Sequence, residues 1–206
     1  MTTQKQFYSY ILLLLATLIV SGIGPYDRLT WLMETAPVMI AIPIMLLTHK
    51  KFPLTELAYS LIFIHCVILM IGGHYTYAKT PVGFWLQHLF DLARNPYDRI
   101  GHFAQGFVPA ILTREILIRV SQIPRGKMLN FLVLCVCLAI SACYEFIEWW
   151  AALLLGQDAE QFLATQGDIW DTQWDMFMAL IGAITALLTL SKWHDKQLNE
   201  LAAKRL

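Results

Sequence analysis

Apolar runs of about twenty residues recur along the whole chain, and they restrict its fold to one that lies in a membrane. As an α-helix, each run is long enough to cross a hydrocarbon core about 30 Å thick. The runs lie at residues 7–24, 31–48, 55–73, 98–119, 128–152 and 170–191. Only 15% of the residues are charged, against about 25% in soluble domains. The sequence therefore predicts an all-α polytopic membrane protein with about six transmembrane helices, in which residues 1–206 form a single integral membrane domain.

The segment between the third and fourth runs predicts a short helix that does not cross the bilayer. Thr80 and Pro81 have the form of a helix N-cap followed by proline at the first helical position. Trp85, Leu89 and Leu92 then recur at helical spacing. This pattern is typical of an amphipathic helix that lies on the membrane surface.

Lysine and arginine are distributed unevenly between the two sides of the predicted membrane. Most of them lie on the side that holds both chain ends, the loop with Lys50 and Lys51, and the loop with Arg125. Because cytoplasmic loops are enriched in lysine and arginine, both termini are predicted to be cytoplasmic. The formal net charge of zero gives no support for binding to nucleic acid.

Three polar stretches interrupt the outer ends of these runs, at residues 95–102, 144–148 and 167–175. His74 ends the third run on the same side. Ionisable side chains at such depths are costly unless they pair, bind an ion or line a wet cavity. Because four helices bring these residues to one side, we expect a single ionisable cluster near the periplasmic face.

Some of the carboxylates in this cluster have an ordinary explanation. Asp98, Asp168 and Asp171 lie at predicted helix starts, where a negative charge complements the helix dipole. The sequence leaves open whether they are more than helix-start residues. His102 and Asp175 lie one turn deeper, four residues after Asp98 and Asp171 and on the same helix faces. The ordinary explanation does not extend to these two residues.

Glu145 and Glu148 lie one turn apart near the end of a predicted helix, where the dipole disfavours negative charge. Like charges at this spacing repel unless one is protonated or a cation lies between them. A mixed set of histidine and carboxylates suits Zn²⁺, Mn²⁺, Fe²⁺ or Mg²⁺. We therefore predict a divalent metal bound by His102, Glu145 and Asp175, with Asp171 as a weaker candidate ligand.

Three further residues are candidates for a general base or for a group that orients a metal ligand. They are Glu148, Asp98 and His74. At the inner end of the fourth run, Glu115 and Arg119 lie four residues apart and are interpreted as an ordinary ion pair.

The motifs DRIGHF (98–103), EFIE (145–148) and DTQWD (171–175) resemble the YjdF-like family of bacterial inner-membrane proteins, over essentially the whole chain. More distantly, the same motifs are similar to the VanZ-like membrane family, which is associated with glycopeptide-antibiotic resistance. Gly182 also matches the VanZ-like pattern, whereas Ala179 stands where that family usually has asparagine. The closer resemblance implies an inner-membrane location, and the distant one implies an envelope-related role.

Three functions remain open from the sequence. The first is a membrane-embedded, metal-dependent enzyme that acts at the periplasmic face on a lipid-linked or envelope-derived substrate. The second is a small transporter or proton-coupled permease whose carboxylates carry a cation or protons. The third is a binding or structural module, in which the cluster is an internal ion-pair network around Arg94 and Arg99.

Overall fold

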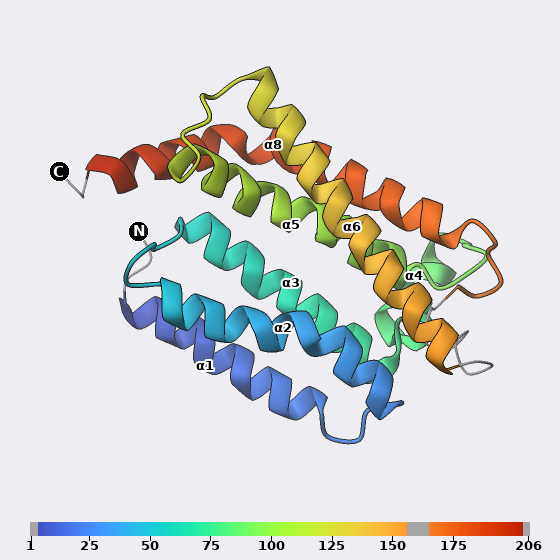
Figure 1. Cartoon of the computed structure of the whole chain (residues 1–206). Helices are drawn as coiled ribbons and strands as arrows, with labels where there is room; N and C mark the ends of the chain where they lie inside the picture. Colours follow the sequence, from blue (N-terminus) through green and yellow to red (C-terminus); the bar gives the residue numbers. More distant parts are fainter. Residues whose placement is uncertain (1–3, 156–164, 204–206) are drawn as a thin grey trace.

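The computed structural model describes residues 4–155 and 165–203, and their regular structure is helical. It has seven α-helices within these ranges (Figure 1). They are α1 (Gln4–Ser21), α2 (Arg28–Thr48), α3 (Glu56–Tyr75), α4 (Pro81–Leu89), α5 (Tyr97–Arg119), α6 (Lys127–Leu155) and α8 (Asp171–Ala203). A 3₁₀ turn, η1 (Tyr77–Lys79), precedes α4. The prediction of an all-α protein is confirmed.

Four of the described helices, α2, α3, α6 and α8, are long and apolar enough to cross a membrane. The predicted number of about six spans is therefore supported only in part. Helix α5 coincides with the fourth predicted span, but it carries charged residues near both of its ends, including Asp98 and Glu115. Helix α1 opens on the polar residues Gln4, Lys5 and Gln6.

Helices α5 and α8 make the most extensive contact in the molecule, and two glycines allow it. A Cβ atom at Gly106 would lie 1.7 Å from the carbonyl oxygen of Ala179. A Cβ atom at Gly182 would lie 2.1 Å from the carbonyl oxygen of Phe103. Because real Cβ atoms do not come this close, only glycine permits the two backbones to touch. This contact sets how the N-terminal halves of α5 and α8 face each other.

The N-terminal helices form the second half of the bundle. Helix α3 packs against α1, α2 and α5, and so joins this half to the half made of α5, α6 and α8 (Figure 1). Phe7, Leu14, Val38 and Met70 are buried where α1, α2 and α3 meet. The first described residues of α1 and the last of α8 lie at the same end of the bundle (Figure 1).

Local signals define several helix starts. Asp27 precedes α2, and its Oδ1 accepts a hydrogen bond of 2.7 Å from the backbone N–H of Thr30. That bond lowers the pKa of Asp27 from its ordinary value. Helix α4 begins at Pro81 directly after Thr80, so the short helix between the third and fourth runs is present as predicted. Its Trp85 remains 62% exposed.

Candidate metal centre

Three buried side chains near the N-terminal ends of α5 and α8 converge on one point. Helix α5 provides Asp98 and His102, and α8 provides Asp175. His102 Nε2 lies 3.6 Å from Asp98 Oδ1 and 3.8 Å from Asp175 Oδ2. One ligand atom from each of the three residues lies within 4.8 Å of the others. Such a group of three side chains could hold a metal ion.

The spacing of these atoms suits a bridging ion better than direct hydrogen bonds. The distances of 3.6 and 3.8 Å from His102 Nε2 exceed the usual limit of about 3.2 Å for hydrogen bonds. Two ligands on a tetrahedral ion, each bonded at about 2.1 Å, lie about 3.4 Å apart. Asp175 Oδ1 is buried and has no hydrogen-bond partner among the described residues. Buried carboxylate oxygens normally have a hydrogen-bond partner, and Asp175 Oδ1 lacks one within the described part of the chain.

Gln105 orients the imidazole ring of His102. Its Oε1 lies 3.1 Å from His102 Nδ1, and because an amide oxygen can only accept, Nδ1 carries the proton. This tautomer leaves the lone pair of Nε2 directed at Asp98 and Asp175. Glu145 Oε1 lies 3.9 Å from Nδ1, so it sits at the edge of the ring that faces away from the two aspartates.

The structure thus groups the predicted site residues differently from the sequence prediction. Asp98, predicted as a base or orienting group, lies with His102 and Asp175, whereas Glu145 lies beside the opposite ring nitrogen. His74 is elsewhere, with its Nδ1 2.8 Å from the carbonyl oxygen of Ser21. It lines a separate cavity between the C-terminal ends of α1 and α3.

Arg94 ties together the carboxylates at the two helix starts. Its guanidinium lies 2.6 Å from Asp171, 3.6 Å from Asp168 and 3.7 Å from Asp98. Arg99 lies 3.0 Å from Asp168. Asp168 and Asp171 are therefore held mainly by arginines. Asp98 has a longer ion pair with Arg94 and also faces His102.

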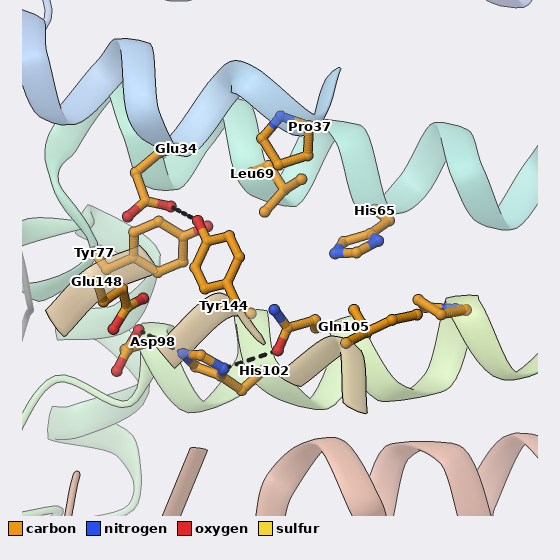
Figure 2. A pocket seen from close by; sticks show the side chains of 13 residues that line it. Glu34, Pro37, His65, Leu69, Tyr77, Asp98, His102, Gln105, Tyr144 and Glu148 are labelled. Carbon is orange, nitrogen blue, oxygen red and sulfur yellow. Dashed lines mark hydrogen bonds and ion pairs between the residues drawn. The ribbon is translucent and has the colours of Figure 1, made fainter. Parts of the chain in front are cut away.

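A cavity of about 220 Å³ lies beside His102 and receives side chains from five elements. Figure 2 shows Glu34, Asp98, His102, Tyr144 and Glu148 around this space. Glu148, one of the predicted base candidates, lines it from α6. A cavity lined by Glu34, Asp98 and Glu148, next to three potential ligand atoms, could hold a small polar group.

Glu34 is a residue of this site that the sequence analysis did not find. It lies within α2, is only 4% exposed, and its Oε2 accepts a hydrogen bond of 3.1 Å from the hydroxyl of Tyr144 (Figure 2). A lone carboxylate inside an otherwise apolar run is the signal that could have identified it.

A second buried polar cluster lies near the opposite end of the same helices. The predicted pair of Glu115 and Arg119 is present, but it belongs to a larger network. Arg114 Nη1 donates to His194 Nδ1 at 3.0 Å, so His194 Nε2 donates to Glu115 Oε2, also at 3.0 Å. Thr55 donates to Glu115 through both its N–H and its hydroxyl. These complementary bonds identify a structural tie between α3, α5 and α8.

Comparisons with known proteins place the chain in a family. Residues 7–196 match the family described as "Predicted membrane protein (DUF2238)". The chain is also similar to a protein named "Inner membrane protein YjdF" from Escherichia coli (strain K12), with 58% identity over 181 residues. That alignment covers 88% of this chain and 87% of the relative. No solved structure matches the chain significantly. This protein is therefore a YjdF-like, multi-pass inner-membrane protein that belongs to the DUF2238 family.

Proposed function

We propose that this protein is a membrane-embedded, metal-dependent enzyme that acts at the periplasmic face on a lipid-linked or envelope-derived substrate. The observation that carries this proposal is the convergence of Asp98, His102 and Asp175. Their ligand atoms are buried next to a cavity that also contains carboxylates. Structural ion pairs do not require such a cavity, whereas a substrate does.

The proposed topology has six spans, adding α1 and α5 to the four helices that qualify by length and apolarity. Leu12 and Ile19 of α1 are each 68% exposed, as expected for side chains that face lipid. Helix α5 packs against α3, α6 and α8, so its polar residues face protein rather than hydrocarbon. The distribution of lysine and arginine supports cytoplasmic termini, and with that orientation the metal centre would lie on the periplasmic side of a single membrane domain.

In the proposed enzyme, each residue of the site would have a distinct role. A divalent ion such as Zn²⁺, Mn²⁺, Fe²⁺ or Mg²⁺ would polarise a substrate oxygen or activate water. Asp98, His102 and Asp175 hold the ion, while Gln105 fixes the ring of His102. Glu148 lines the cavity without joining the three ligand atoms, so it is placed to accept a proton from water or substrate.

Metal analysis of the purified protein tests the proposal. After chelation and reloading with Zn²⁺ or Mn²⁺, the unaltered protein should retain stoichiometric metal, whereas Asp175→Asn and His102→Ala should not. Asp195→Asn is the matched control, because Asp195 pairs with Arg114 in the other cluster. Metal retention that is the same in Asp175→Asn as in the unaltered protein would overturn the proposal.

One observation favours a proton-coupled permease as the second candidate. Buried histidine–carboxylate clusters occur near both ends of α5 and α8, around His102 and around His194. A proton path through these helices would use both clusters. In reconstituted vesicles, a proton flux that Glu115→Gln and Asp175→Asn both abolish would favour the permease over the enzyme.

A purely structural role is the third candidate. The ion pair of Arg99 is the observation that supports it. Its pairing with Asp168 at 3.0 Å is what an internal ion-pair network would require. The network, however, runs mainly through Arg94 and the helix starts, and it leaves the cavity beside His102 open. The enzyme therefore accounts for more of the site.

A further inference from the structure

An apolar groove continues from the polar cavity. The groove has a volume of about 720 Å³, and its walls come mainly from α2, α3 and α5. Pro37, His65 and Leu69 line both spaces. The two spaces therefore adjoin at these three side chains, and a molecule with one polar and one apolar end that passes between them could occupy both.

The groove has the chemistry and length of a site for a hydrocarbon chain. Apart from His65 and Thr48, its lining side chains are apolar or Cys66. From Pro37 to Thr48 it follows eleven helical steps along α2, or ~17 Å at ~1.5 Å per residue. One leaflet contributes about half of a hydrocarbon core that is about 30 Å thick. The groove is thus long enough to hold one lipid chain along its length.

The groove is accessible from the surrounding bilayer. Ile40 and Ile44 on α2 are 59% and 53% exposed, and Ile116 and Val120 on α5 are 47% and 61% exposed. All four belong to its lining, so they form rims that face outward. Since the family is one of membrane proteins, lipid chains are the apolar molecules at hand, and they can enter sideways between α2 and α5.

His65 marks the boundary between the two spaces. It lies on α3, and Figure 2 shows its ring directed towards the cavity, on the side away from Glu34. Its Nε2 is buried and lacks a hydrogen-bond partner within residues 4–155 and 165–203. In a lipid, the boundary between head group and chain carries ester or ether oxygens. His65 Nε2–H is placed to donate a hydrogen bond to such an oxygen.

We propose that the groove binds one hydrocarbon chain of a membrane lipid whose head group lies in the polar cavity. The carboxylates of Glu34, Asp98 and Glu148 line that cavity, so they complement a head group with hydroxyl or amino donors. The lipid is then the substrate class of the proposed enzyme. That the lipid is a substrate rests on the proposed function. That the lipid binds in the groove does not.

Photocrosslinking in phosphatidylethanolamine vesicles tests this orientation. Two diazirine probes are compared, one with the reactive group close to the head group and the other with it at the chain end. Adducts are mapped by mass spectrometry. The first probe should label residues near Leu69 and Pro37, and the second should label residues near Ile116 and Thr48.

Filling the groove provides a matched pair of variants. Ala41 lines the groove, whereas Leu47 lies on the same helix outside it and is 77% exposed. Ala41→Phe should reduce groove adducts about tenfold, which corresponds to ~1.4 kcal/mol, and Leu47→Phe should leave them unchanged. Both variants should retain metal, because neither residue contacts the metal centre. Lipid labelling and metal binding can therefore fail independently of each other.

Two results would overturn the proposal. A reversed order of labelling would mean that a lipid of the opposite leaflet inserts its chain from the Thr48 end. Labelling of the groove no stronger than that of Leu188, which is 81% exposed on α8, would mean that lipid meets this groove only by chance. The order of labelling is measured in the unaltered protein, so the proposal is tested even if Ala41→Phe does not fold.

Discussion

His102 is the residue on which the candidate site depends, because its two ring nitrogens face different groups. Nε2 faces Asp98 and Asp175, while Nδ1 faces Gln105 and Glu145. Mutating a group that fixes the tautomer of a metal-binding histidine typically lowers metal affinity by about 10- to 100-fold. Gln105 is therefore expected to affect metal affinity measurably, although it is not a ligand.

Replacing Gln105 with leucine should weaken metal binding by about 10- to 100-fold, since His102 Nδ1 loses the acceptor that fixes its proton. Gln105→Glu retains an acceptor at the same position and should restore most of the affinity. Isothermal titration with Zn²⁺ measures both variants. Equal affinities for Gln105→Leu and the unaltered protein would show that this hydrogen bond does not orient the ring.

Tyr144 holds the carboxylate of Glu34 in the cavity through a hydrogen bond of 3.1 Å. Tyr144→Phe removes the donor and leaves Glu34 buried, so the free energy of unfolding should fall by about 1–3 kcal/mol. Thermal unfolding in detergent measures the change. Tyr8→Phe is the control, because Tyr8 is 45% exposed on α1. Identical unfolding of the two variants would contradict the role given to this bond.

At the scale of the helices, the close contact of α5 and α8 builds the candidate metal centre. It brings His102 to Asp175 only because Gly106 and Gly182 let the backbones touch. Any side chain at Gly106 would meet the carbonyl group of Ala179 rather than a flexible side chain. The helices would have to separate, and the ligand atoms would separate with them.

Gly106→Ala should therefore lower both stability and metal affinity. Overpacking of this kind typically costs about 1–3 kcal/mol. Leu188→Ala, at an exposed position of α8, is the control and should change neither property. Thermal unfolding and metal titration are measured on the same preparations. Loss of stability with unchanged metal affinity would show that the site does not depend on this contact.

The same contact explains which parts of the site could be predicted from the sequence. Helix bounds follow from the length of apolar runs and from local caps, and the face shared by Asp98 and His102 follows from helical spacing. The choice of Asp98 over Glu145 beside Nε2 depends on how α5 is rotated against α8 and α6. Glu34 enters the site through the approach of α2 to Tyr144. Such tertiary geometry leaves no periodic pattern in the sequence.

At the scale of the whole molecule, two buried polar clusters serve different purposes. In the cluster at Glu115, both carboxylate oxygens accept hydrogen bonds, which come from His194, Thr55 and Arg119. The cluster at His102 has unpaired carboxylate oxygens and an adjoining cavity. The Glu115 cluster is therefore assigned to stability and the His102 cluster to function.

His194→Leu should destabilise the protein by about 3–5 kcal/mol, because it leaves the carboxylate of Glu115 without one of its buried partners. Metal bound per folded molecule should not change. Unfolding in detergent and metal analysis of the folded fraction measure the two effects. A loss of metal in the folded fraction would mean that the two clusters are coupled, as in a proton path.

Topology is tested by introducing cysteines in a variant whose native cysteines are replaced. An impermeant maleimide applied to intact spheroplasts should label Asp91→Cys, in the segment after α4, and should not label Lys50→Cys, after α2. This result follows from the positive-inside rule. The opposite pattern would place the metal centre on the cytoplasmic side.

X-ray absorption at the metal edge tests the central claim most directly, because it reports the ligands of the bound ion. The purified protein reloaded with Zn²⁺ or Mn²⁺ should show imidazole nitrogen and carboxylate oxygen at about 2.0–2.2 Å. In His102→Ala, the bound metal and with it the imidazole contribution should both be lost. A protein that retains no metal, or a spectrum that His102→Ala leaves unchanged, would contradict the account.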